Sequence, residues 1–200
     1  MKKQYTTADF LRWNRNPSKP TIKLPPHRGR FDREHWIAHL ANQYKWTIGA
    51  ELGIWRGRTF LHLLEHCPNL TLIGVDLWEP QPDNQGPETW ENWPHEQYEK
   101  DVRNRARKYG KRAIIIKNWT DKAAEQVEDN SLDFVFVDAD HSTEAVRNDF
   151  ITWIPKVKDS GFLIGHDINW PTVKCVADEL VPGYVIGPDN AWGRQKCLKQ

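Results

Sequence analysis

The chain has 200 residues, with 28 Lys and Arg against 27 Asp and Glu and a formal net charge of +1. This length suits one domain with a substantial core. The near-zero charge gives no overall field for nucleic acid, and no apolar stretch is long enough to predict a membrane span. A cytoplasmic protein without a disulfide framework or zinc site is expected, because no paired spacing links the three cysteines, Cys67, Cys175 and Cys197.

Charge is unevenly placed along the chain. Residues 1–30 carry eight Lys and Arg and four prolines against a single acidic residue, Asp9. We expect a basic N-terminal arm over 1–30 and one domain over 31–200. The arm can be a solvated tail, or it can contact an anionic substrate or a second subunit of a homo-oligomer.

Helical and strand patterns alternate after the arm. In chain order we expect a helix at 31–44, a strand at 46–54, a helix at 58–67, a strand at 70–78, a loop at 79–94 and a helix from about 95 to 109. We then expect a strand at 112–119, a helix at 121–127, a strand at 132–140, a helix at 143–157, a strand at 161–168, a helix at 172–180 and a hairpin over 184–198.

The strand patterns are continuously apolar, as is typical of strands that are buried on both faces. Because helices alternate with them, the sequence predicts an α/β fold with a doubly wound, mostly parallel, Rossmann-like sheet. The terminal hairpin would close this sheet with antiparallel strands.

Polar residues follow the strands at their carboxyl ends, where such sheets bind ligands. The first strand runs into AELGIWRGRT, where Gly53 permits a tight turn and Gly57 a close approach of the backbone. Asp76 ends the second strand and can accept hydrogen bonds from a ribose, or it can act only as a cap. The spacing G-x-x-x-G matches an NAD site poorly. Together with Glu51, these residues favour an adenosine-containing ligand.

The third strand ends in KNWT. Trp119 can stack on an adenine while Asn118 and Thr120 bond its edge. Trp119 can equally be a packing residue.

Asp138 lies at the end of the fourth expected strand and Asp167 at the end of the fifth, each with a histidine nearby. Because neighbouring parallel strands end at the same edge, we expect the two carboxylates to lie close together, in an oxygen-rich pocket suited to Mg²⁺ or another divalent cation. His141 can then reach a substrate hydroxyl as a general base. The alternative is that these residues only cap the helices that follow.

Four segments, AELGIWRGRT, LIGVDLW, LDFVFVDADHSTEAVRNDF and SGFLIGHDI, resemble the class I S-adenosylmethionine-dependent methyltransferases. The resemblance covers about 47–168 and is closest to the small-molecule O-methyltransferases of the catechol-type and metal-dependent sugar branch. It implies that S-adenosyl-L-methionine is the cofactor and that its methyl group passes to a hydroxyl of a small acceptor. Implied cofactor contacts are Glu51, Gly53, Gly57, Thr59, Asp76, Leu77, Asn118, Trp119 and Asp138.

The resemblance also implies the catalytic groups. Asp138 would stand by the amino group of the cofactor and bind the metal, with His166 and Asp167 as further metal ligands. His141 falls where the family places its base. His166 is a departure, because those relatives carry a carboxylate there, and this leaves a metal-free mechanism open.

The loop at 79–94 is rich in proline and tryptophan, and we expect it to be a substrate lid. Aromatic faces with carboxylates suit sugars, polyols, cations or planar aromatic acceptors, although the tryptophans can also simply hold the loop in place. The acidic loop makes nucleic acid an unlikely partner. Two rival functions are an NAD(P)-type oxidoreductase or epimerase and a non-catalytic nucleoside-binding protein.

Overall fold

The computed structural model of the chain describes residues 31–80 and 93–196. The basic arm at 1–30, the greater part of the expected lid at 79–94, and Cys197 lie outside the described residues. Within the two described ranges, no helix is both long enough and apolar enough to cross a membrane.

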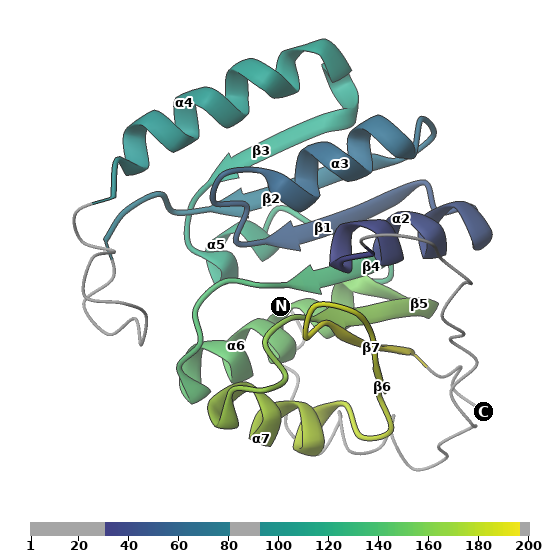
Figure 1. The fold of residues 1–200 in the computed structure, drawn as a ribbon. Coiled ribbons are helices and arrows are strands. Elements are labelled where there is room, and N and C mark those ends of the chain that lie inside the picture. The colour runs from purple at the N-terminus through teal and green to yellow at the C-terminus, as the bar shows by residue number, and fades with distance from the viewer. Residues whose placement is uncertain (1–30, 81–92, 197–200) are drawn as a thin grey trace.

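Seven strands form one sheet in the order β3-β2-β1-β4-β5-β7-β6 (Figure 1). The first five are parallel, whereas β7 runs antiparallel to β5 and β6 antiparallel to β7. Their bounds are β1 Ile48–Leu52, β2 Thr71–Asp76, β3 Ala113–Lys117, β4 Leu132–Val137, β5 Val157–Gly165, β6 Val185–Ile186 and β7 Trp192–Gln195. This arrangement confirms the expected fold class. The order of strands reverses between β1 and β4, and sheets of this kind bind ligands at such a reversal.

Helices cover both faces of the sheet (Figure 1). One hydrophobic cluster lies under α2 (Arg33–Gln43), α3 (Arg58–His66) and α4 (His95–Ala106), and the other under α5 (Thr120–Ala124), α6 (Thr143–Trp153) and α7 (Pro171–Leu180). Short 3₁₀ segments, η2 (Arg107–Arg112) and η3 (Ile154–Lys156), follow α4 and α6.

Strand β4 shows why the strands read as unbroken apolar runs. Phe134 and Phe136 join the cluster on the α2–α4 side, while Val135 and Val137 join the one on the α5–α7 side. Both faces of the strand are therefore buried, and neither can carry polar side chains.

Several expected boundaries were wrong by three or four residues. The helix expected to reach residue 157 ends at Trp153, and Pro155 lies in the 3₁₀ turn that follows. Proline lacks the N–H that would continue the helix. Strand β5 then begins at Val157 and ends at Gly165, so His166 and Asp167 lie in the loop beyond it. Strand β4 likewise ends at Val137, directly before Asp138.

Candidate active site

A cleft of about 1040 Å³ opens at the carboxyl ends of the parallel strands, beside the reversal between β1 and β4. Its volume is at the upper end of the range of about 300–1,000 Å³ for small-molecule sites, which suits two reactants side by side. The cleft is lined by all of the site residues expected from the sequence except Gly57.

The turn after β1 brings the chain against the end of β4. Gly53 has a φ of +84°, and a Cβ atom there would lie 2.0 Å from the backbone oxygen of Asp138. Only glycine fits this approach. Gly57 has a φ of +75° at the start of α3, where a Cβ would meet the side chains of Leu61 and Val102 at 3.0 Å. The structure therefore places Gly57 behind the wall of the cleft.

Asp76 organises the loops on one side of the cleft. Its Oδ2 accepts the backbone N–H of Trp55 at 2.6 Å, and its Oδ1 accepts that of Trp78 at 2.7 Å. Both tryptophans have positive φ, +47° and +46°, a strained conformation for large side chains that the carboxylate helps to hold. Burial raises the pKa of Asp76, although these N–H groups act in the opposite direction. Asp76 is thus a cap, and an ionised carboxylate also has lone pairs left for a ligand.

Glu51 and Thr59 present unsatisfied polar atoms at the wall of the cleft. Their side chains are 2% and 1% exposed, and Glu51 Oε2 and Thr59 Oγ1 have no hydrogen-bond partner among the described residues. Burial, and then the nearby charge of Asp138, raise the pKa of Glu51 well above its usual range. Buried polar atoms are normally hydrogen-bonded, so these two groups indicate where a polar ligand belongs.

Trp119, just after β3, is 55% exposed and lines the cleft, so it is not a core packing residue. Asn118 Oδ1 accepts the backbone N–H of Trp119 at 2.9 Å, which leaves the amide N–H groups of Asn118 available. An exposed indole face next to an amide donor suits a planar heterocycle.

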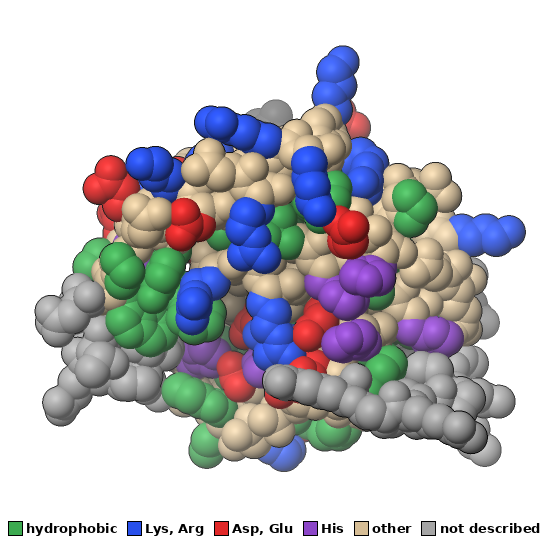
Figure 2. All heavy atoms as spheres, turned by 45° about the horizontal axis from the view of Figure 1, so that its top comes forward, with side chains coloured by type: hydrophobic (Ala, Val, Ile, Leu, Met, Phe, Trp, Pro, Cys, Tyr) green, Lys and Arg blue, Asp and Glu red, His purple; other side chains and the backbone are tan. Residues whose placement is uncertain are grey.

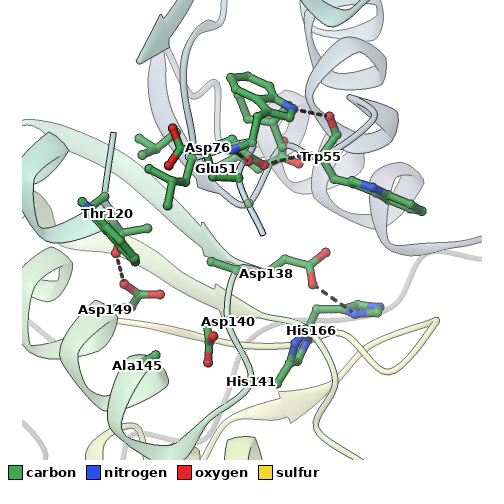
Figure 3. A pocket seen from close by; sticks show the side chains of 18 of the residues that line it. Glu51, Trp55, Asp76, Thr120, Asp138, Asp140, His141, Ala145, Asp149 and His166 are labelled. Atoms are coloured by element: carbon green, nitrogen blue, oxygen red, sulfur yellow. Dashed lines mark hydrogen bonds and ion pairs between the residues drawn. The ribbon is translucent and has the colours of Figure 1, made fainter. Parts of the chain in front are cut away.

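Asp149, on α6, was not expected to line the cleft, but it does so (Figure 3). Its Oδ1 accepts a hydrogen bond from Thr120 Oγ1 at 2.5 Å, and its Oδ2 has no partner among the described residues. Burial raises the pKa of Asp149 to about 7, against the opposing effect of Thr120. A signal existed in the sequence, because Asp149 shares helical spacing with Val146, Phe150 and Trp153 on the buried face of α6.

The ends of β4 and β5 bring four predicted residues together, because Val137 pairs with Gly165 in neighbouring strands. His141 Nε2 lies 2.7 Å from Asp167 Oδ2, and His166 Nδ1 lies 3.0 Å from the same oxygen. His166 Nδ1 is also 3.5 Å from Asp138 Oδ1 (Figure 3). The sequence-based expectation that Asp138 and Asp167 meet at one edge is confirmed.

The charges in this cluster shift one another. Burial alone would lower the pKa of His166, but the carboxylates of Asp138 and Asp167 raise it to about 9. Burial would raise the pKa of Asp167, but hydrogen bonds from His141 and His166 hold it well below its usual range. Asp167 is therefore an ionised acceptor for two imidazoles.

Arg33, at the start of α2, reaches into the same cluster and was not expected from the sequence. Its Nη2 lies 3.6 Å from Asp138 Oδ2, its Nη1 lies 3.3 Å from His166 Nε2, and Nη1 also donates to Asp189 Oδ2 at 2.8 Å. Arg58 contacts Asp189 as well, at 3.7 Å, and forms ion pairs with Asp32 and Glu34. Figure 2 shows acidic, basic and histidine side chains intermixed near the lower centre of the face drawn there, so neither positive nor negative side chains form a patch of their own at that place.

The divalent metal implied by the resemblance can be tested against these donors. Asp138, His141 and Asp167 offer ligand atoms within 4.8 Å of one another. His166 cannot act as a further metal ligand. The guanidinium of Arg33, which faces His166 Nε2, has hydrogen-bond donors and no acceptor. Facing that donor, His166 Nε2 either accepts a hydrogen bond or belongs to an imidazolium, and in both states Nδ1 carries a hydrogen. A ligating nitrogen needs its lone pair.

Hydrogen-bond donors already face both carboxylates. The guanidinium of Arg33 and the imidazole of His166 face Asp138, while the imidazoles of His166 and His141 face Asp167. A divalent cation would have to bind next to a guanidinium that stays charged at all accessible pH values. These residues therefore do not fit a resident divalent cation.

Comparisons with known proteins agree with this architecture. A family model described as a methyltransferase domain matches residues 50–168. The O-methyltransferase NovP is 16% identical, with a TM-score of 0.59 over 80% of this chain and 76% of its own. The calicheamicin methyltransferase CalS11 is 10% identical, with a TM-score of 0.63 over 80% and 76%. The SAH-bound methyltransferase PaMTH1 of Podospora anserina is 15% identical, with a TM-score of 0.56 over 95% and 87%.

At these identities the solved structures show a shared fold, and the family model is the finding that shows the family. No curated protein matches the chain in sequence.

Proposed function

The chain belongs to the methyltransferase-domain family, and on this premise we propose that it transfers a methyl group from S-adenosylmethionine to a hydroxyl of a small molecule. The observation that carries the proposal is the convergence of the ends of all five parallel strands on one cleft. Glu51 lies next to the last residue of β1, Asp76 ends β2 and Trp119 follows β3. The loop after β4 and the loop after β5, the fifth strand end at this edge, bring in the pair of His141 and Asp167.

The cleft fits this cofactor. Glu51 Oε2 and Thr59 Oγ1 are buried polar atoms in need of a partner, which an amino acid moiety can provide. The turn at Gly53 leaves no room for a side chain, so the wall next to Asp138 is backbone. Trp119 offers an exposed face for an adenine, and Asp76 offers oxygen lone pairs for a ribose.

When bound, S-adenosylmethionine supplies an electrophilic methyl group on a sulfonium, and S-adenosylhomocysteine remains after the transfer. His141 and Asp167 act on the acceptor side of this reaction. Nε2 of the imidazole donates its hydrogen to Asp167 at 2.7 Å, so Nδ1 is the nitrogen that takes the proton of the acceptor hydroxyl, and Asp167 stabilises the imidazolium that results. The freed oxygen is then a competent nucleophile for the methyl carbon, and the walls of the cleft align the two reactants.

The acceptor in this proposal is a sugar or another polyol. One structural neighbour, CalS11, is named as a TDP-rhamnose 3′-O-methyltransferase. In this chain, the indoles of Trp55 and Trp93 stack at 5.0 Å on the edge of the cleft, and Trp55 is 41% exposed. Exposed tryptophan faces bind the apolar faces of sugar rings as well as planar groups.

Thermal melting with S-adenosylhomocysteine or NAD tests the cofactor. A ligand at one hundred times its dissociation constant stabilises a protein by about 2.7 kcal/mol. For a domain of this size we expect a rise in Tm of roughly 5–10 °C with S-adenosylhomocysteine. A rise in Tm with NAD alone would support the rival oxidoreductase or epimerase. An unchanged Tm with both ligands would contradict the proposal.

Transfer of a radiolabelled methyl group to a panel of sugar nucleotides, polyols and phenols tests the reaction. We expect label in a hydroxyl-bearing acceptor. Cofactor binding without transfer to any acceptor of the panel would support the second rival, a non-catalytic nucleoside-binding protein.

A further inference from the structure

We propose that Arg33, held against Asp138 and His166, is the built-in cation of this site, and that methyl transfer by this protein needs no divalent metal. The inference rests on the proposed function, because it concerns the acceptor end of the same cleft. The observation behind it is the pair of contacts that Arg33 makes, with Asp138 Oδ2 at 3.6 Å and with His166 Nε2 at 3.3 Å.

Arg33 is held in this position from several sides. The start of α2 carries it, the loop between β6 and β7 supplies Asp189 at 2.8 Å, and the loop after β4 supplies Asp138. Its side chain is 15% exposed, and its Nε is buried with no partner among the described residues. The guanidinium is therefore largely removed from water, where a charge acts more strongly on its neighbours.

A second cluster of acidic residues, which shares Asp189 with Arg33, also binds an arginine. Ligand atoms of Asp32, Glu34 and Asp189 also lie within 4.8 Å of one another. Arg58 forms ion pairs with Asp32 and Glu34, its Nη2 donating to Glu34 Oε1 at 2.9 Å, and it approaches Asp189 at 3.7 Å. Within residues 31–80 and 93–196, both clusters that could hold a cation thus already contain an arginine. Charges alternate from Arg58 through Asp189 and Arg33 to Asp138.

This arrangement has a chemical consequence. A divalent ion in a methyltransferase site would favour the ionised form of the acceptor hydroxyl by its positive charge. Fixed cations aimed at the place where an oxyanion develops do the same without a metal. Arg33 lies in the part of the cleft that also contains His166 and His141, so its charge favours loss of the acceptor proton.

Metal binding can be measured without any acceptor. The protein is treated with EDTA, desalted, saturated with S-adenosylhomocysteine, and titrated with Mn²⁺ while the spectrum of free Mn²⁺ is followed by electron paramagnetic resonance. We expect the wild type to bind no Mn²⁺ up to about 1 mM. Stoichiometric binding with a dissociation constant below about 100 µM that Asp167→Asn abolishes would overturn the proposal.

A gain-of-binding variant makes the test two-sided. His166→Asp combined with Arg33→Met removes the guanidinium and replaces the imidazole by a carboxylate beside Asp138 and Asp167. We expect this double variant to bind Mn²⁺ at least tenfold more tightly than the wild type. If it is folded, binds S-adenosylhomocysteine and still does not bind Mn²⁺, then Arg33 and His166 are not what excludes the metal, and the proposal fails.

The rate of methyl transfer by the wild type, measured with and without EDTA, is a second test of the proposal. It does not depend on the folding of any variant. We expect equal rates, and a loss of more than tenfold that Mn²⁺ or Mg²⁺ restores would overturn the proposal.

Arg33→Met should lower kcat at least about 100-fold with a nearly unchanged affinity for S-adenosylhomocysteine, and Arg33→Lys should recover part of the rate. Arg147→Met is the matched control, because Arg147 pairs with Glu179 outside the cleft.

The two levels of proposal fail separately. If S-adenosylhomocysteine does not bind, the proposed function itself is contradicted. If it binds and the metal proves necessary, only the role of Arg33 and His166 is contradicted.

Discussion

His141 and Asp167 form one functional pair across two loops, with Nε2 of the imidazole 2.7 Å from Oδ2 of the carboxylate. The loop after β4 carries the histidine, and the loop after β5 carries the aspartate. The side chains are 12% and 19% exposed, so little water competes for their contact. The ring of His141 also packs against Trp170, with centroids 4.6 Å apart, which helps to fix its orientation.

The first prediction concerns this pair. His141→Ala should lower kcat by about 10²–10⁴-fold, the usual contribution of a general base. Asp167→Asn should lower it as well, because the amide cannot stabilise the imidazolium as a carboxylate does. Isothermal titration with S-adenosylhomocysteine should give a dissociation constant for His141→Ala within a few fold of the wild type. An unchanged kcat for His141→Ala would remove this residue from the mechanism.

The second prediction concerns the pH dependence set by Asp149. Its pKa is raised from an ordinary 3.8 to about 7, so the folded protein retains a proton that the unfolded chain has released. The stability that this retained proton contributes to the folded state is fully present below about pH 4, and it is lost as the pH rises through about 7. Asp149→Asn, which mimics the protonated acid, removes this loss. Between pH 5 and 8, the free energy of unfolding should fall by about 3 kcal/mol more in the wild type than in the variant.

Urea denaturation of both proteins at several pH values measures this difference, and all other titrating groups cancel in it. Thr120→Val provides a companion test. The hydroxyl of Thr120 acts to lower the pKa of Asp149, so its removal should extend the loss of stability to higher pH. Parallel pH profiles for the wild type and Asp149→Asn would show that Asp149 is ionised in the folded protein.

The third prediction compares two glycines that have positive φ. Alanine at either position costs about 1–2 kcal/mol for the left-handed backbone. At Gly53, the added Cβ would also collide with the backbone oxygen of Asp138 at 2.0 Å, whereas at Gly57 it meets flexible side chains at 3.0 Å. Gly53→Ala should therefore lower the Tm further and weaken S-adenosylhomocysteine binding at least tenfold, while Gly57→Ala should keep the affinity. Equal losses of affinity would place Gly57 in the cofactor site.

The fourth prediction concerns Trp119. Stacking of a base on an aromatic side chain is worth about 1–3 kcal/mol, so Trp119→Ala should raise the dissociation constant of S-adenosylhomocysteine by roughly 5–150-fold. Trp119→Phe should retain much of the affinity. Because the indole is 55% exposed, neither substitution should change the Tm of the free protein greatly. Unchanged affinity in the alanine variant would show that the adenine lies elsewhere.

The sequence alone determined the sheet and the edge at which the site lies. A parallel strand buried on both faces must be apolar throughout, and β4 displays this in Phe134, Val135, Phe136 and Val137. Polar residues directly after such strands then fall at a common edge, which is why Asp138 and Asp167 could be expected to meet. The reversal of strand order between β1 and β4 turns this edge into a cleft.

Only the tertiary structure decided which charges oppose those carboxylates. Arg33 is 133 residues away from His166 along the chain and sits on a helix whose apolar spacing says nothing about its polar side chains. The spacing of α6 marks Asp149 as buried but does not identify its partner, since this carboxylate meets Thr120 only when α5 and α6 pack together. Apolar periodicity records which faces are buried, because burial acts on every residue of a face. A single ion pair between distant residues leaves no such repeated pattern, so its partners are settled only when the elements come together in space.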